Sequence, residues 1–244
     1  MKLKPADACN KVEMWLVSRT SEANANGVVV GMSGGVDSSV TSVLAKRALS
    51  DKVLGLILPC DSDPKDAARA QMLAEKFGMR TETIDLTAAF HELRKILPSA
   101  DVKTLGNLKA RLRMAALYHY ANKDCLLVLG TSNKSEIAIG YFTKHGDGAA
   151  DLEPLGGLYK TQVVEIARHL ELPDDIINAA PTAGLWDGQT DEGEIGMKYI
   201  ELDSILHALE RNKEVAADAK KLARLKDLIK KSSHKRKMPD VCVI

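Results

Sequence analysis

Aromatic side chains and closely spaced cysteines are scarce in this 244-residue sequence. Aromatic residues make up only 4% of it, which argues against a platform on which single-stranded nucleic acid would stack. No Cys-x-x-Cys pair occurs, which excludes the usual spacing of zinc sites and redox motifs. We expect the four separate cysteines to be reduced and mostly buried, as in cytosolic proteins: Cys9, Cys60, Cys125 and Cys242.

An excess of charge of one sign and long apolar runs are also lacking. Thirty-four lysines and arginines stand against thirty-three aspartates and glutamates, so the formal net charge is +1. That balance gives no electrostatic reason to expect a nucleic-acid partner. No apolar stretch approaches the length of a membrane span, and the N-terminal residues lack the apolar core of a signal peptide. We therefore expect a soluble cytoplasmic protein with neither a nucleic-acid nor a membrane partner.

Short apolar runs and helical patterns alternate through the first half of the chain. The runs at residues 28–30, 53–58, 81–86 and 126–129 suit buried parallel strands. Three helices are predicted between them, the first begun by Pro64 and ended near Gly78, the second capped by Thr87 over residues 88–97, and the third over residues 103–122 with Leu105, Leu108, Leu112 and Ala115 on its apolar face. This alternation predicts an α/β fold with a doubly wound parallel sheet.

We interpret residues 1–244 as a single domain in three parts. Residues 1–26 are expected to form an N-terminal helix, residues 27–180 a nucleotide-binding α/β core, and residues 181–244 a substrate loop and C-terminal helices. Two amphipathic helices are predicted in the last part, one with Ile195, Leu202, Ile205, Leu206 and Leu209 on its apolar stripe, the other with Val215, Leu222, Leu225 and Ile229. Such stripes normally face a core or a dimer partner.

A turn of small residues at 31–39, Gly-Met-Ser-Gly-Gly-Val-Asp-Ser-Ser, is the most informative stretch. It lies between the first predicted strand and a helix, where backbone N–H groups and the helix dipole attract anions. Gly34 and Gly35 lack a Cβ and let a phosphate approach the main chain. The serines add hydroxyl donors, and Asp37 offers a hard carboxylate for a magnesium ion carried by phosphates.

This turn contains no lysine, so it is not a Walker loop, which aims a lysine at the terminal phosphates. The pattern Ser-Gly-Gly-x-Asp-Ser instead resembles the PP-loop of the ATP pyrophosphatase superfamily. The resemblance implies a sheet of the adenine-nucleotide α-hydrolase-like type and cleavage of ATP between its α- and β-phosphates.

A second polar stretch, Gly-Thr-Ser-Asn-Lys-Ser-Glu at residues 130–136, follows the last predicted strand. Thr131 and Ser132 are plausible caps for the short helix expected after them. Glu136 falls one turn later, where a cap alone does not require a carboxylate.

Six polar segments together resemble the NAD synthetase family: 31–39, 107–114, 130–136, 140–161, 181–192 and 233–239. They occur in the family's order and span nearly the whole chain. The most specific are Gly-Tyr-Phe-Thr-Lys-His-Gly-Asp and Leu-Trp-Asp-Gly-Gln-Thr-Asp-Glu. The loop at residues 58–67 looks shorter than in the family, so no residue role is carried over from it.

The resemblance implies ATP-dependent amidation of deamido-NAD. The nicotinate carboxylate attacks the α-phosphorus of ATP and forms an adenylate and pyrophosphate, and ammonia then attacks the activated carbonyl to give NAD and AMP. Because the substrate supplies its own nucleophile, no catalytic side-chain nucleophile is expected. Catalysis then consists of screening like charges and holding two anions in line.

The resemblance also implies site residues. Contacts to ATP are implied for Gly31, Met32, Ser33, Gly34, Gly35, Val36, Asp37, Ser38, Thr131, Lys160 and Thr182. Contacts to deamido-NAD are implied for Arg111, Lys144, Asp151, His234 and Lys235. Mg²⁺, the implied cofactor, matches Asp37 and Glu136, which as hard carboxylates suit that ion.

Larger NAD synthetases carry an N-terminal glutaminase domain, and we expect none here because the first nucleotide-binding strand begins by residue 28. Ammonia is then free or supplied by a separate protein. Related enzymes are homodimers, so a homodimer is expected. Two alternatives stay open: another PP-loop enzyme that modifies tRNA or transfers sulfur, and a non-catalytic nucleotide-binding module of the universal-stress type.

Overall fold

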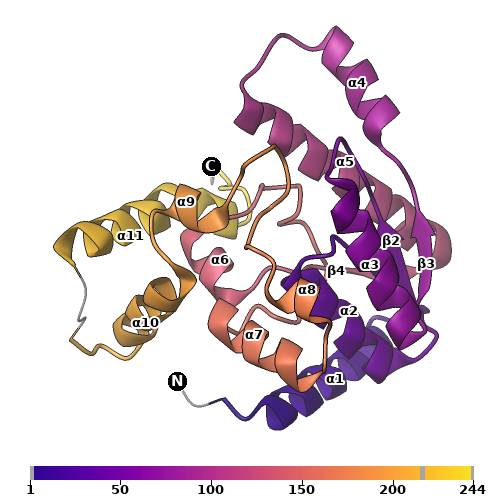
Figure 1. Ribbon diagram of the computed structural model, residues 1–244, viewed down its shortest axis with the longest axis horizontal. Helices are drawn as coiled ribbons and strands as arrows, with labels where there is room; N and C mark the ends of the chain where they lie inside the picture. Colours follow the sequence, from indigo (N-terminus) through magenta and orange to yellow (C-terminus); the bar gives the residue numbers. More distant parts are fainter. Residues whose placement is uncertain (1–2, 215–217, 243–244) are drawn as a thin grey trace.

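The computed structural model describes residues 3–214 and 218–242 (Figure 1). A sheet of four parallel strands lies at its centre, in the order β3-β2-β1-β4. The strands are β1 (Gly27–Gly31), β2 (Val53–Ile57), β3 (Arg80–Thr83) and β4 (Leu126–Leu129). All four predicted strands are therefore confirmed. After β1 the chain adds β2 and β3 on one side of it and later adds β4 on its other side, so the order in which strands are added reverses at β1.

Eleven helices and a short 3₁₀ turn occur in the described residues: α1 (Pro5–Glu22), α2 (Val36–Leu49), α3 (Pro64–Phe77), α4 (Thr87–Ile96), α5 (Val102–Asp124), α6 (Lys134–Ile139), α7 (Lys160–His169), α8 (Asp174–Ile177), α9 (Asp191–Ile195), α10 (Tyr199–Glu210), α11 (Ala219–Lys231) and the turn Ser233–Arg236.

Helices cover both faces of the sheet, as predicted. Side chains of a strand point alternately to its two faces. Val28 and Val30 pack with α1, α2 and α7, whereas Val29 packs with Ala121 of α5. Burial on both faces explains why β1 is apolar throughout. The doubly wound arrangement leaves the carboxyl ends of the strands open to loops.

Helix α3 begins and ends as predicted, whereas α4 begins differently. Pro64 is the first residue of α3, and Gly78 ends it in a left-handed conformation with φ +59°. Thr87 is the first residue of α4 rather than its cap. The N-cap is Leu86, which makes no side-chain capping bond, and Asp85 Oδ1 accepts the Thr87 N–H at 2.8 Å. The prediction that Thr87 caps this helix was therefore wrong.

Helix α5 covers the sheet only with its C-terminal half. The predicted apolar face is not a buried face: Leu108 is half-buried and Ala115 is exposed. Lys109 and Ala110 are buried instead. The N-terminal half of α5 extends past the sheet, beside α4 and the loops around the strand ends (Figure 1), so its contacts are not those of a core helix.

The helices after residue 190 build a hydrophobic cluster of their own. Ile195, on its own helix α9, packs with α10 and with Leu225 of α11, and these three helices enclose Ile139 and Tyr159 from the α6–α7 region. Within the predicted stripes, five residues are buried (Ile195, Leu202, Ile205, Leu206 and Leu225), three are half-buried (Leu209, Leu222 and Ile229), and Val215 lies outside the described residues. The prediction of a single helix carrying Ile195 and Leu202 was wrong, because Gly196 ends α9 in a left-handed conformation with φ +84°.

Two further expectations concern the cysteines and the membrane. Cys9 and Cys60 are buried, but Cys125 and Cys242 are exposed, so the prediction of mostly buried thiols holds for half of them. Among the described helices, none combines the length and the apolar character needed to cross a bilayer.

Candidate functional site

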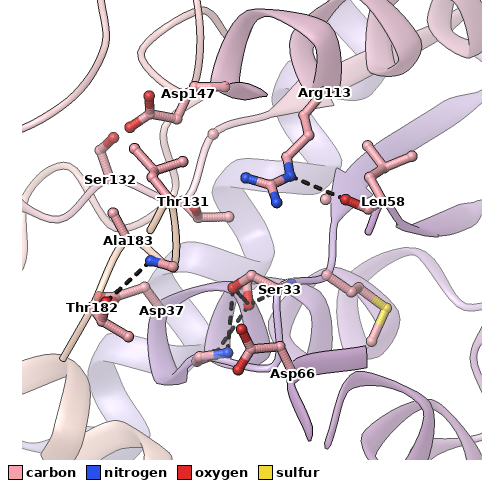
Figure 2. A pocket seen from close by; sticks show the side chains of 18 of the residues that line it. Ser33, Asp37, Leu58, Asp66, Arg113, Thr131, Ser132, Asp147, Thr182 and Ala183 are labelled. Carbon is pink, nitrogen blue, oxygen red and sulfur yellow. Dashed lines mark hydrogen bonds between the residues drawn. The ribbon is translucent and has the colours of Figure 1, made fainter. Parts of the chain in front are cut away.

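A cavity of about 280 Å³ opens at the carboxyl ends of β1, β2 and β4 (Figure 2). Open parallel sheets bind ligands at this end, next to the point where the strand order switches. All the predicted ATP-binding residues except Gly34 line it: Gly31, Met32, Ser33, Gly35, Val36, Asp37, Ser38, Thr131, Lys160 and Thr182. Glu136 also lines it, so the structure brings the two predicted metal ligands to the same wall.

The small-residue turn at residues 31–39 closes on itself at the start of α2. Ser38 Oγ accepts the Ser33 N–H at 3.2 Å and donates to the Gly35 carbonyl at 3.0 Å. Ser33 Oγ accepts the Gly35 N–H at 3.3 Å, which closes the turn on itself. Gly35, the N-cap of α2, provides no side-chain cap. The first N–H groups of this 14-residue helix therefore remain available to an anion in the cavity.

Gly34 faces away from the cavity, against the first turn of α3. Its φ of +77° lies in the left-handed region that favours glycine. A Cβ at this position would lie 2.3 Å from the Asp66 carbonyl oxygen. Arg69 completes the contact by donating from Nε to the Gly34 carbonyl at 3.2 Å. Gly34 therefore fixes the loop to α3 and does not line the cavity.

Asp37, Glu136 and Lys160 form a buried charged cluster at one end of the cavity. Lys160 Nζ, at the start of α7, donates to Asp37 Oδ2 and lies 3.4 Å from Glu136 Oε1. The three side chains are 6% exposed for Lys160, 15% for Asp37 and 13% for Glu136. Burial by itself would lower the pKa of Lys160, but Asp37 and Glu136 raise it above its ordinary value. Lys160 is thus a cation held between the two predicted metal ligands.

Asn133 orients both carboxylates. It is the N-cap of α6, so the prediction that Thr131 or Ser132 caps this helix was wrong. Asn133 and Glu136 form a capping box, in which each side chain accepts the backbone N–H of the other at 3.1 Å. Asn133 Nδ2 also donates to Asp37 Oδ1 at 2.9 Å. Glu136 therefore serves a cap and the charged cluster at once.

Tyr199 and Asp191 complete the cluster from the C-terminal helices. The Tyr199 hydroxyl lies 3.2 Å from Glu136 Oε1 and 3.1 Å from Asp191 Oδ2. Asp191 is only 4% exposed, and its Oδ1 has no hydrogen-bond partner within the described part of the chain. Burial and the nearby Asp37 carboxylate raise the pKa of Glu136 to about 8. Three carboxylates against one lysine leave the cluster short of positive charge.

Comparisons with known proteins identify the family of the chain. The sequence model of the NAD synthase family matches residues 8–239. The chain is 47% identical over 243 residues to the NH(3)-dependent NAD(+) synthetase of Methanocaldococcus jannaschii, with 94% of each chain covered. It is 43% identical to the enzyme of that name from Carboxydothermus hydrogenoformans, over 99% of each chain. The chain belongs to the NAD synthetase family.

Solved structures resemble the chain over its whole length. The NMN synthetase of Francisella tularensis has a TM-score of 0.92 and 38% identity, and 100% of each chain is covered. The NH3-dependent NAD synthetase of Campylobacter jejuni has a TM-score of 0.87 and 31% identity, over 99% of this chain and 100% of that one. Membership of this family makes the protein a ligase that carries out ATP-dependent amidation in NAD biosynthesis.

Of the four basic residues matched to the acid substrate of NAD synthetases, three are joined by hydrogen bonds, and the fourth, Lys235, directly follows His234 in the chain. Arg111 Nη2 donates to the Lys144 carbonyl at 3.2 Å, and Lys144 Nζ donates to the His234 carbonyl at 2.8 Å. Lys235 donates to the Phe142 carbonyl at 2.7 Å. These residues lie outside the lining of the cavity, so they form a separate basic group.

Asp151 is placed apart from that group. Its Oδ2 accepts the Val128 N–H at 2.8 Å, and its Oδ1 accepts the Tyr118 hydroxyl at 3.2 Å. Both partners belong to the sheet and to α5, so within this structure Asp151 ties the chain after the glycine-rich segment to the edge of β4. Its predicted contact with deamido-NAD stays a prediction.

The sequence analysis missed Arg113, which lines the cavity across from Ser33 (Figure 2). Its Nε donates to the Leu58 carbonyl at 3.0 Å and its Nη2 to Ser62 Oγ at 2.9 Å. Burial lowers its pKa below the ordinary value. The only signal in the sequence was its place in the segment 107–114. Leu58 and Ser62 belong to the short loop from which no role was carried over, and this loop lines the cavity as well.

Proposed function

We propose that the protein amidates deamido-NAD with ammonia, with ATP in the cavity and the acid substrate against the basic group Arg111, Lys144, His234 and Lys235. The supporting observation is the lysine-free loop at the start of α2, beside the Asp37–Glu136–Lys160 cluster. Donors that converge on one point suit a pyrophosphate leaving group. The apolar wall formed by β2 and by Met114 of α5 suits the adenine ring.

We further propose that Asp37 and Glu136 bind Mg²⁺. The donor set fits a hard cation, because both groups are carboxylates, and burial together with the nearby Asp37 carboxylate raises the pKa of Glu136 to about 8. No group of three His, Cys, Asp or Glu side chains in the described ranges is arranged to hold a metal. Phosphate oxygens would therefore complete the ligand shell. When bound, the ion neutralises charge on the α- and β-phosphates.

Binding and orienting the substrates are functions of the protein's own groups. The N–H groups at the start of α2 and the hydroxyls of Ser33 and Ser38 hold the phosphates that leave as pyrophosphate. Lys160 donates to a phosphate oxygen and stabilises negative charge there. Thr131 and Thr182 line the cavity in which we place the nucleotide (Figure 2). Positioning the substrate carboxylate in line with the α-phosphorus needs no side-chain nucleophile.

Nicotinate mononucleotide is a second candidate for the acid substrate. The structure with a TM-score of 0.92 and 38% identity to this chain is an NMN synthetase. Both acids carry the same reacting carboxylate and differ in the adenylate half. The two candidates therefore share every step at the cavity and differ only in contacts beyond it.

The test is a turnover assay with purified protein, ATP, Mg²⁺ and ammonium, with either deamido-NAD or nicotinate mononucleotide as the acid. We expect AMP and NAD in equal amounts with deamido-NAD, resolved by chromatography. If the mononucleotide is turned over faster, it would be assigned as the substrate in place of deamido-NAD. Formation of ADP and orthophosphate, or turnover that requires RNA, would contradict the proposal as a whole.

We also propose a homodimer located in the cytoplasm. Exposed apolar side chains gather where α4 passes into α5, with Ile96 77% and Val102 53% exposed. Burying them against a second subunit would remove apolar surface from water. Light scattering during size-exclusion chromatography would give the mass of one subunit if this is wrong.

A further inference from the structure

Lys160 occupies the position that a metal ion would take between Asp37 and Glu136. Its Nζ contacts an oxygen of each carboxylate, and it is 6% exposed, so it cannot simply swing into solvent. A divalent ion bound by the same two carboxylates would repel the ammonium group at contact distance. In the absence of nucleotide phosphates, metal binding therefore requires a second protein anion that can receive Lys160 within the site.

Asp191 is that anion. It lines the same cavity, it is 4% exposed, and its Oδ1 has no hydrogen-bond partner in the residues described. It also lies next to Lys160 through Tyr199, whose hydroxyl contacts Asp191 Oδ2 at 3.1 Å and whose ring centroid is 5.1 Å from Lys160 Nζ. An unpartnered buried carboxylate oxygen is costly, so a cation that reaches it gains much of that cost back.

Tyr199 links the two arrangements. Its hydroxyl bridges Glu136 Oε1 and Asp191 Oδ2, and its ring lies under Lys160 Nζ, 5.1 Å from the ring centroid. A hydroxyl has one proton, so it donates to one of these carboxylates at a time. The ring face offers the ammonium group a favourable surface between the two carboxylates.

We propose that Asp191 is a positioning residue that receives Lys160 when a metal ion takes Asp37 and Glu136. The metal ion thus replaces the Lys160 ammonium group between Asp37 and Glu136, and Lys160 stays beside the phosphate-binding end of the cavity. This inference rests on the proposed metal site at Asp37 and Glu136. It assigns to the 181–192 segment a role in loading the metal.

The experiment measures Mn²⁺ alone, by the electron paramagnetic resonance signal of the free ion, on the whole chain without nucleotide. Lys160→Met removes the internal competitor, and we expect it to tighten Mn²⁺ binding about tenfold. Lys134→Met is the matched control, because Lys134 lies at the start of α6 but pairs with Glu210. Binding to Lys160→Met that is no tighter than in the unmodified protein would overturn the proposal.

A double-mutant cycle tests Asp191 itself. We expect Asp191→Asn to weaken Mn²⁺ binding about tenfold more when Lys160 is present than in the Lys160→Met variant. The reason is that Asp191 has a displaced lysine to bind only in the protein that keeps Lys160. An equal loss of Mn²⁺ affinity with and without Lys160 would mean that Asp191 acts on the metal through its own charge. That result would overturn the proposal that Asp191 receives Lys160.

Thermal unfolding establishes that each variant is folded. If Asp191→Asn does not fold, the comparison of Lys160→Met with Lys134→Met decides the proposal alone. Unmodified protein that binds no Mn²⁺ even with a non-hydrolysable ATP analogue would overturn the metal site and this inference together. If Mn²⁺ binds but Asp191→Asn weakens its binding equally with and without Lys160, only the role of Asp191 is overturned and the metal site stands.

Discussion

Replacing Gly34 by alanine tests whether the phosphate loop depends on its contact with α3. The left-handed φ of +77° costs an alanine roughly 1–2 kcal/mol. A smaller gain of about 0.4–1 kcal/mol, from the lower entropy of the unfolded chain, offsets part of this. The new Cβ would also lie 2.3 Å from the Asp66 carbonyl oxygen, so backbone must move. Such overpacking costs about 1–3 kcal/mol.

Gly78→Ala is the matched control, because Gly78 has a φ of +59° and a Cβ added to it would meet nothing within 4 Å. It therefore carries the backbone cost without the overlap. The expected loss in the free energy of unfolding is about 1 kcal/mol for Gly78→Ala and about 3 kcal/mol for Gly34→Ala. For a chain of this length, these losses lower the unfolding midpoint by about 2–4 °C and about 6–12 °C.

The functional consequence is measured as the affinity for a non-hydrolysable ATP analogue by calorimetry. Movement of the loop away from α3 misaligns Ser33 and the first N–H groups of α2, so we expect affinity at least about tenfold lower for Gly34→Ala. The control should bind like the unmodified protein. Equal stability of the two variants, with unchanged binding, would refute the claim that this contact holds the loop.

Three further predictions concern charge. Asp37→Asn should lower AMP formation by roughly 100-fold or more, measured by chromatography, while the folded structure persists in circular dichroism. Glu153→Gln should raise the unfolding midpoint more at pH 9 than at pH 5. Burial raises the pKa of Glu153 to about 8, so the folded state keeps a proton that the unfolded chain releases above its ordinary 4.5, and the unmodified protein loses stability across that interval. No such pH difference would contradict the burial argument. Arg111→Ala should raise the KM for the acid substrate about tenfold and leave that for ATP unchanged, in steady-state kinetics; an equal rise for both would contradict a separate basic group.

The strands and the small-residue turn at residues 31–39 could be predicted from local patterns. Apolar runs identify β1, β2 and β4 because both faces of the sheet are buried. The loop could be predicted because its glycines and serines stand together in the sequence. Family resemblance added Lys160 and Thr182, which no local pattern connects to that loop.

The rest depended on tertiary contacts. Asn133 could not be identified as the cap of α6 because three consecutive polar residues were all suitable. The bridge from Tyr199 to Glu136 joins residues 63 positions apart, and nothing in either segment indicates the other. Asp151 binds the backbone of β4, a contact that sequence alone does not distinguish from a ligand contact.

The C-terminal hydrophobic cluster has a consequence for the integrity of the enzyme. Ile139 follows Glu136 by three residues and Tyr159 directly precedes Lys160, and both are enclosed by α9, α10 and α11. Helix α11 supplies no ligand to the charged cluster, yet it shields the two anchors that hold that cluster in register. We therefore expect a chain shortened before α11 to lose activity even if its central sheet forms, because Ile139 and Tyr159 would be exposed to water.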